Sequence, residues 1–177
     1  LTANTTSGSN TSVGAYSLNA NTTGGDNTAC GRSALQANTT GNANVAVGYN
    51  SMQNNTTASN NTSVGYAALF TNTTGHSNTA VGYEALKDQT TTNNNTGVGY
   101  KSLENQTGTK NTGHGAYTLG NGTTGDSNTA MGYAALYQNT ASENTAVGYD
   151  ALYSNTTGTR NTAIGGKAAN TCVDGAN

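Results

Sequence analysis

The sequence is poor in charged residues and contains neither proline nor tryptophan. Charged side chains make up 8% of its 177 residues, against about 25% in an average soluble domain. It has no basic stripe, so we expect no nucleic-acid binding through phosphate neutralisation. It also has no apolar run of about 18 residues, the length that a membrane-spanning helix needs, so we expect no membrane insertion.

The chain offers little material for catalysis. Its two histidines, His76 and His114, have no nucleophile or carboxylate at a motif spacing. The eight acidic residues are scattered and form no calcium loop, and the glycines lack the spacing of a phosphate-binding loop. We therefore predict a protein that is not an enzyme and that uses no metal and no cofactor.

What the sequence has in abundance is a repeat. Thr, Asn and Gly together account for 86 residues, from 34, 28 and 24 of each. The segment Asn-Thr-Ala-Val-Gly-Tyr-x-Ala-Leu recurs along the chain, and its Gly returns every 17 residues, with two intervals of 16 that lose one residue from the turn region. The Asn that opens the motif is present in all ten copies: Asn10, Asn27, Asn44, Asn61, Asn78, Asn95, Asn111, Asn128, Asn144 and Asn161.

This repeat predicts an all-β fold, a parallel β-solenoid (a β-roll or β-helix) of ten coils of about 17 residues. Seventeen residues are too few for a helical hairpin repeat, and the motif alternates with period 2, as a strand does. We expect a second short strand through Ala-Leu, then a turn. Stacked at about 4.8 Å, ten coils span roughly 48 Å. The predicted single domain covers 1–177, with a partial leading coil at 1–9, ten coils at 10–169 and a C-terminal tail at 170–177.

The stacking aligns equivalent side chains into files. The ten asparagines are expected to form a ladder at a corner, hydrogen-bonded along the axis. The Val before the Gly and the Leu four residues after it, such as Val81 and Leu86, are expected to form a thin core. Because so thin a core buries little apolar surface in each coil, we expect further apolar surface to be buried by self-association. The tyrosines that follow the Gly are the candidates for this contact, or for stacking on glycans: Tyr49, Tyr66, Tyr83, Tyr100, Tyr133 and Tyr149.

The only two cysteines are Cys30 and Cys172. They lie about eight coils apart, roughly 38 Å along the axis, whereas a disulfide needs Cα atoms within about 7 Å. An intrachain disulfide is therefore excluded. Two interpretations stay open: Cys30 fills a Val position of the core while Cys172 is free or capped, or the two cysteines join successive subunits.

The Asn-Thr-Ala-Val-Gly-Tyr-x-Ala-Leu arrays resemble those of phage tail fibres and, more distantly, the head repeats of trimeric autotransporter adhesins of the YadA type. The resemblance covers essentially the whole chain, although the motif is short. It implies a left-handed parallel β-roll, often trimeric, located outside the cell as a secreted, cell-surface or virion-surface protein. Because the chain begins at Leu1, with no initiator Met or apolar signal region, we expect a processed chain or a fragment.

The sequence also contains 13 Asn-x-Ser/Thr sequons, and eight of them fall at the same turn edge of the repeat. A glycan at such an edge would be solvated and would leave the core undisturbed. The candidate N-glycosylation sites are Asn21, Asn38, Asn55, Asn72 and Asn155.

Three functions fit these observations. The first is a non-enzymatic extracellular structural module that associates with copies of itself, as a trimer or as a head-to-tail filament, since both ends look like ordinary coils without caps. The second is a phage tail-fibre or adhesin module that binds host-surface glycans. The third is an ice-binding solenoid that uses a file of threonines, although Val45 and the 16-residue intervals are expected to spoil its flatness: Thr28, Thr62, Thr79, Thr96, Thr112, Thr129, Thr145 and Thr162.

Overall fold

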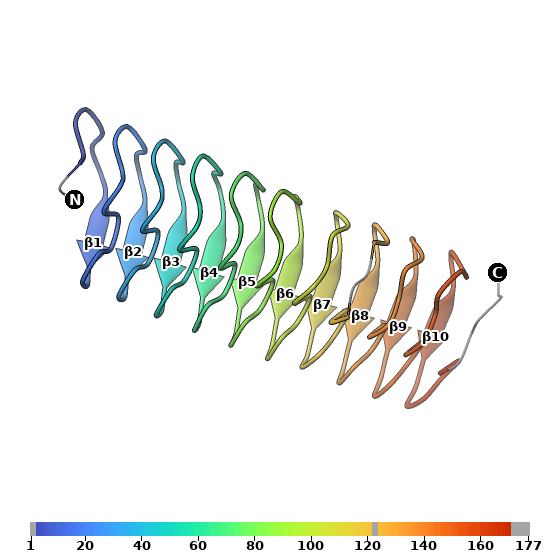
Figure 1. The fold of residues 1–177 in the computed structure, drawn as a ribbon. Coiled ribbons are helices and arrows are strands. Elements are labelled where there is room, and N and C mark those ends of the chain that lie inside the picture. Colours follow the sequence, from blue (N-terminus) through green and yellow to red (C-terminus); the bar gives the residue numbers. More distant parts are fainter. Residues whose placement is uncertain (1–2, 122–123, 171–177) are drawn as a thin grey trace.

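A computed structural model, which describes residues 3–121 and 124–170, is a straight rod of stacked coils (Figure 1). Its strands have three residues each and pair in parallel, in chain order, as one ten-stranded sheet. The predicted β-solenoid is confirmed. The strands are β1 (Thr11–Val13), β2 (Thr28–Cys30), β3 (Val45–Val47), β4 (Thr62–Val64), β5 (Thr79–Val81), β6 (Thr96–Val98), β7 (Thr112–His114), β8 (Thr129–Met131), β9 (Thr145–Val147) and β10 (Thr162–Ile164).

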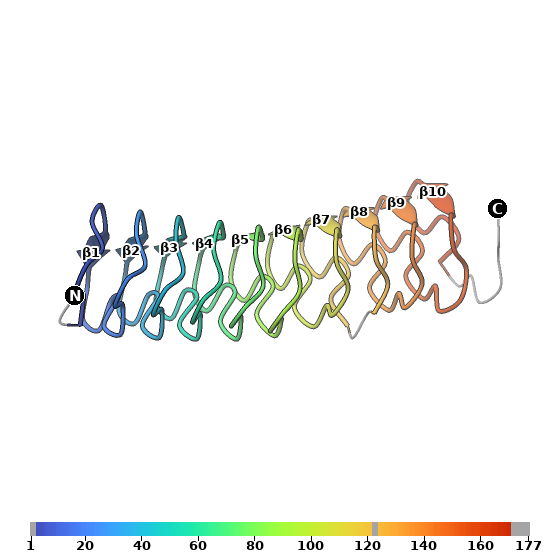
Figure 2. The same cartoon turned by 90° about the horizontal axis from the view of Figure 1, so that it is seen from above.

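Equivalent residues of successive repeats lie next to one another along the whole sheet. Val64 pairs with Val81, which is the register that a period of 17 requires. The two 16-residue intervals keep this register, because Thr96 pairs with Thr112 and Thr129 with Thr145. Turns therefore absorb the missing residues, and the strands form an unbroken row along one side of the rod (Figure 2).

After each strand the chain turns a corner at a glycine and returns as a second layer that is not a strand. The prediction of a second short strand is wrong. Alternate residues of this layer have left-handed backbone conformations, such as Glu84 at φ 52° and Leu86 at φ 50°, and a strand does not allow this. The layer is nevertheless bonded along the axis: the Leu86 N–H donates to the Ser102 carbonyl at 3.0 Å, and the Glu84 N–H donates to the Tyr66 carbonyl at 2.9 Å.

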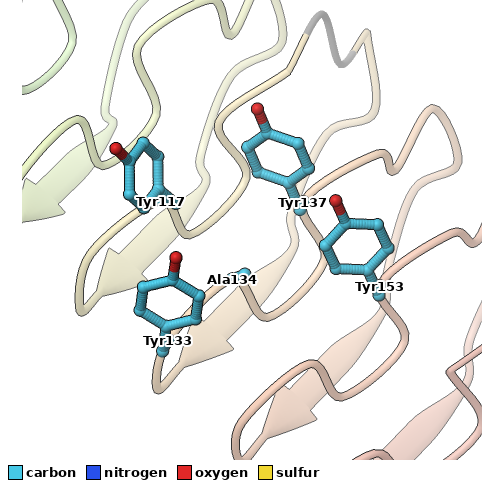
Figure 3. A pocket seen from close by; sticks show the side chains of 5 residues that line it. All are labelled: Tyr117, Tyr133, Ala134, Tyr137 and Tyr153. Atoms are coloured by element: carbon cyan, nitrogen blue, oxygen red, sulfur yellow. The ribbon is translucent and has the colours of Figure 1, made fainter.

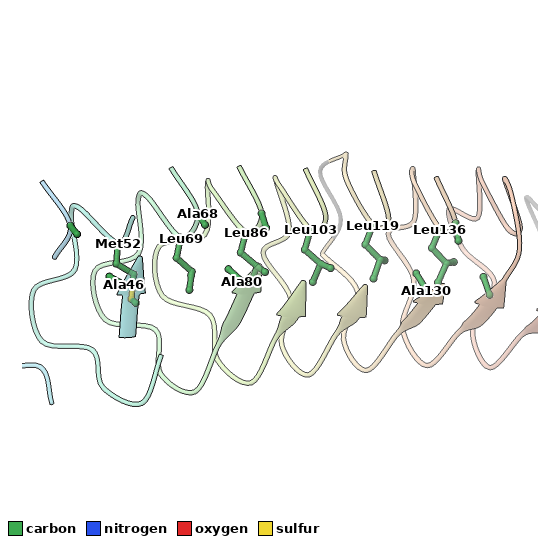
Figure 4. Packing of buried hydrophobic residues seen from close by; sticks show 14 of the residues in the cluster. Ala46, Met52, Ala68, Leu69, Ala80, Leu86, Leu103, Leu119, Ala130 and Leu136 are labelled. Carbon is green, nitrogen blue, oxygen red and sulfur yellow. The ribbon is translucent and has the colours of Figure 1, made fainter. Parts of the chain in front are cut away.

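The core lies between the strands and this second layer, and it is narrow (Figure 4). Leucines of the second layer, with Met52 in one coil, are fully buried from Leu18 to Leu152. The middle residue of each strand also points inward and is small, such as Ala80. At Gly97, an added Cβ would lie 2.3 Å from the Leu86 Cδ1 atom, so the interior has no room for a larger side chain there.

The predicted Val core is wrong, because the first and third residues of each strand point outward. Val64 is 37% exposed and Ile164 is 73% exposed, whereas Ala80 between Thr79 and Val81 has no exposed surface. Leu and Ala therefore carry the burial. The Thr and Val files cover the outside of the sheet, and we call this surface the Thr–Val face.

Candidate functional site

The ten repeat asparagines form a continuous file at the starts of the strands. Eight of them, from Asn27 to Asn144, are fully or almost fully buried. At each of the nine steps, the side-chain Oδ1 accepts a hydrogen bond from the backbone N–H of the next Asn, at 2.8–3.0 Å. The Nδ2 of Asn61 donates to the carbonyl of Gly75, in the turn that closes the coil, at 2.9 Å. This file links each strand to its neighbour and to the turn beside it.

The five candidate glycosylation sites also point into the rod. All five side chains are fully buried. They form a second file, in which Asn38 Nδ2 donates to Asn21 Oδ1 and Asn55 Nδ2 donates to Asn38 Oδ1, both at 2.8 Å. An N-linked glycan would replace a hydrogen of the Asn Nδ2 atom. It would then have to occupy space that neighbouring coils already fill. The prediction of solvated glycans at Asn21, Asn38, Asn55, Asn72 and Asn155 is therefore wrong, because stacking buries that side of the turn.

The predicted tyrosine stripe runs along the corner beside the Thr–Val face. Its six members are between 41% and 52% exposed. Four of them, Tyr49, Tyr66, Tyr83 and Tyr100, stack in sequence with ring centroids 5.0–5.5 Å apart and planes within 10°. Arg32 lies over the Tyr49 ring at 5.7 Å. These rings cover each other's faces, so this part of the stripe presents ring edges and hydroxyls to its surroundings.

Beyond Tyr100 the stack is broken. The next repeat has its tyrosine one position later, at Tyr117, and this ring stands at 70° to Tyr100 and at 73° to Tyr133. Two further tyrosines, Tyr137 and Tyr153, occupy the position after the core Leu and stack on one another with centroids 5.3 Å apart. These two were not among the residues predicted from the sequence, although their recurrence at one place in consecutive repeats was a visible signal.

Together these side chains form a pocket of about 300 Å³ (Figure 3). Its lining consists of Tyr117, Tyr133, Ala134, Tyr137 and Tyr153. Ala134 is almost fully buried. Figure 3 shows the four rings around it, with their hydroxyls directed to the same side.

In two earlier coils the equivalent positions of the second layer hold charged residues. There Lys101 contacts Glu84 at 3.1 Å and Glu104 at 3.0 Å, and Lys87 contacts Glu84 at 3.2 Å. Burial raises the pKa of the Glu84 carboxyl, but hydrogen bonds and charge from Lys101 and Lys87 lower it by more, so its pKa lies below the ordinary value. Ion pairs therefore cover the second layer in these coils, whereas the pocket lies at Ala134.

The cysteines are not placed as a pair. Cys30 lies at the outward-pointing end of β2 and is exposed, so its predicted core position is wrong for the same reason as that of the valines. Cys172 lies outside the described residues. The intermolecular disulfide stays a prediction.

The described residues hold no group of three or more His, Cys, Asp or Glu side chains that could bind a metal ion. His114 ends β7 and points outward, and the His76 Nδ1 accepts a hydrogen bond from the Ser59 N–H at 2.9 Å. Over the same residues, no helix is long and apolar enough to cross a membrane.

No family model matches the chain, and neither do any curated proteins or solved structures. The function is therefore inferred from the side chains that the rod exposes, together with the resemblance of its repeat.

Proposed function

We propose that the chain is a non-enzymatic structural rod, displayed outside the cell, whose Thr–Val face associates with further copies of the same chain. The observation that carries the proposal is the outward direction of the Val file. Val13, Val64, Met131 and Ile164 are between 37% and 73% exposed, all on the same side of one sheet. The file continues between them through half-buried members: Val47, Val81, Val98 and Val147. An aligned row of exposed apolar side chains is typical of an interaction surface, since burying it against a partner is favourable.

A second copy fits this face because the face is regular along the whole rod. Nine of the ten strands begin with Thr and six end with Val, on either side of an inward residue, and the strands are in register from β1 to β10. A surface that repeats every coil matches its own repeat on another molecule at many points. The resemblance to tail-fibre and adhesin arrays supports both the oligomer and its extracellular location.

Replacing Val64 and Val81 together by Lys is expected to weaken self-association at least tenfold, because two charged side chains would have to be desolvated in the contact. Both positions point outward, so the variant is expected to fold. Sedimentation velocity over a range of concentrations measures the association, and far-UV circular dichroism measures the fold.

The matched control is Thr57→Lys with Thr74→Lys. Both threonines are exposed, in the turns of neighbouring coils and away from the Thr–Val face. This control is expected to associate as the unaltered chain does. A chain that is monomeric at all concentrations, or equal losses in both variants, would contradict the proposal.

Ice binding is the second candidate, favoured by the file of threonines on the same face. The 16-residue intervals leave the strands in register, so this file continues across them. Under this hypothesis the protein at millimolar concentration gives thermal hysteresis, and Thr79→Lys with Thr96→Lys removes it. Absence of hysteresis in the unaltered protein rejects this candidate and leaves the structural proposal in place.

A further inference from the structure

We propose that the tyrosine pocket above Ala134 binds the pyranose ring of a neutral saccharide. This goes beyond the structural function and does not depend on it. The pocket lies on the second layer and the corner, behind the Thr–Val face, because Tyr133 follows the β8 strand and Tyr137 follows the core Leu136. Self-association through the Thr–Val face would therefore leave the pocket open.

Ring faces become available at this place and not along the rest of the stripe. In the stacked segment each ring is covered by its neighbours, as Tyr66 and Tyr83 are at 5.0 Å and 7°. Tyr117 is perpendicular to Tyr133 and also to Tyr137, at 82° and 6.3 Å. Tyr133 stacks on Tyr149 and Tyr137 stacks on Tyr153. Tyr117 makes only perpendicular contacts among the described residues, so its ring face is the one left for a ligand. Such a face can pack against the C–H groups of a sugar ring.

The pocket lining also pairs these apolar faces with hydrogen-bonding groups. It offers four phenol hydroxyls and the methyl group of Ala134. Burial is the largest effect that raises the pKa of Tyr117 and of Tyr153 above the ordinary phenol value. The hydroxyls of Tyr117 and Tyr153 therefore stay protonated at neutral pH. A phenol hydroxyl can both donate to and accept from a sugar hydroxyl.

The charge and the size of the pocket narrow the class of ligand. Among the described residues, no charged side chain lines it. A quaternary ammonium group could use the ring faces, but it has no N–H to donate and therefore makes no use of the four hydroxyls. A volume of about 300 Å³ lies at the lower end of the range for small-ligand pockets, which suits one or two sugar rings.

The pocket depends on particular residues of this part of the chain. Ala134 occupies the position that holds Glu84 and Lys101 in two earlier coils, where these two residues form an ion pair. Tyr137 and Tyr153 occupy the position that Lys87 holds. The coil with Ala67 and Phe70 has the same small and aromatic pair, but its stripe tyrosine Tyr66 is stacked on its neighbours. The perpendicular Tyr117 is therefore what distinguishes the coils of the pocket.

The test is saturation-transfer difference NMR with methyl glycosides of glucose, galactose, mannose and N-acetylglucosamine, with lactose, cellobiose and chitobiose, and with choline chloride. We expect at least one neutral sugar to give saturable binding in the millimolar range, with the signals on its ring C–H protons. Tyr137→Leu is expected to weaken that binding about tenfold, and Tyr137→Phe less, since it keeps the ring.

Tyr66→Leu is the matched control, because it removes a stripe tyrosine outside the pocket, and it is expected to bind as the unaltered chain does. Binding by none of the sugars, equal binding by the Tyr137→Leu variant, or pocket-dependent binding of choline alone would overturn the proposal. Repeating the titration on the Val64→Lys, Val81→Lys variant separates sugar binding from self-association. If association is lost and sugar binding is intact, the pocket is supported independently of the oligomer. If this folded variant loses sugar binding, the proposal of an open and independent pocket is contradicted.

Discussion

Replacing Gly82 by Ala is expected to destabilise the rod by more than about 4 kcal/mol, the range reached by severe core substitutions. Gly82 has φ +137°, which an L-residue rarely adopts, and an added Cβ would lie 2.3 Å from the carbonyl oxygen of Gly99 in the next coil. That carbonyl belongs to backbone and cannot move aside as a side chain would. The two coils would have to separate, and this would break the hydrogen bond that the Gly99 N–H donates to the Val81 carbonyl at 2.8 Å. Urea unfolding followed by circular dichroism measures the loss.

Gly25→Ala is the control for this substitution. The Cβ added there would lie 3.5 Å or more from its neighbours, at ordinary contact distance and without a positive φ. Its stability is expected to change by no more than about 0.5 kcal/mol. If both variants unfold at the same urea concentration, the close approach of successive corner glycines is not what limits the fold.

The fold could be predicted from the sequence because the repeat specifies how the coils stack. Gly and Asn return at fixed intervals, and parallel coils are the arrangement in which a period of 17 brings equivalent residues together, as for Val64 and Val81. The position of the 16-residue intervals was also informative, since a turn can lose a residue without shifting the register of a strand.

The direction of the strand side chains could not be predicted in the same way. Alternation in Thr-Ala-Val separates Ala from the other two residues, but it does not say which set points inward. Apolarity favoured the Val, whereas the narrow interior selects the smaller residue, as Ala80 between Thr79 and Val81 shows. Because the sequence prediction chose the wrong set, it placed the Val file and Cys30 in the core. It therefore missed the apolar side chains on the outer surface of the sheet.

The second layer escaped prediction because its backbone is unusual for its residues. Leu86 and Glu84 have positive φ values, which cost free energy for residues with a Cβ and are rare outside Gly, Asn and Asp. Ten coils repeat this conformation, and neighbouring coils hold it through hydrogen bonds such as that from Leu86 to Ser102. The same backbone turns Asn55 and its equivalents inward, and for this reason a local sequon led to a wrong expectation about glycans.

Replacing Asn61 by Ala is expected to lower the free energy of unfolding by about 4 kcal/mol, the second large effect. The Oδ1 of Asn61 accepts the Asn78 N–H at 2.8 Å, and its Nδ2 donates to the Gly75 carbonyl at 2.9 Å. Asn61 and Asn78 are fully buried. Alanine removes the partner of both groups, and each buried group left without a partner costs about 1–3 kcal/mol. The urea midpoint of the variant gives the measurement.

Asn54→Ala provides the comparison, because Asn54 is also an asparagine but is half-buried and lies outside both buried files. Its loss is expected to change stability by no more than about 0.5 kcal/mol. Each coil contacts only its neighbours, so a weakened step between two coils divides the rod into parts that can unfold separately. The Asn61→Ala variant should therefore also broaden its transition, with amide exchange fastest at the coils that contain Asn61 and Asn78. A sharp transition at the unaltered midpoint would show that the asparagine file adds little to the stacking of the coils.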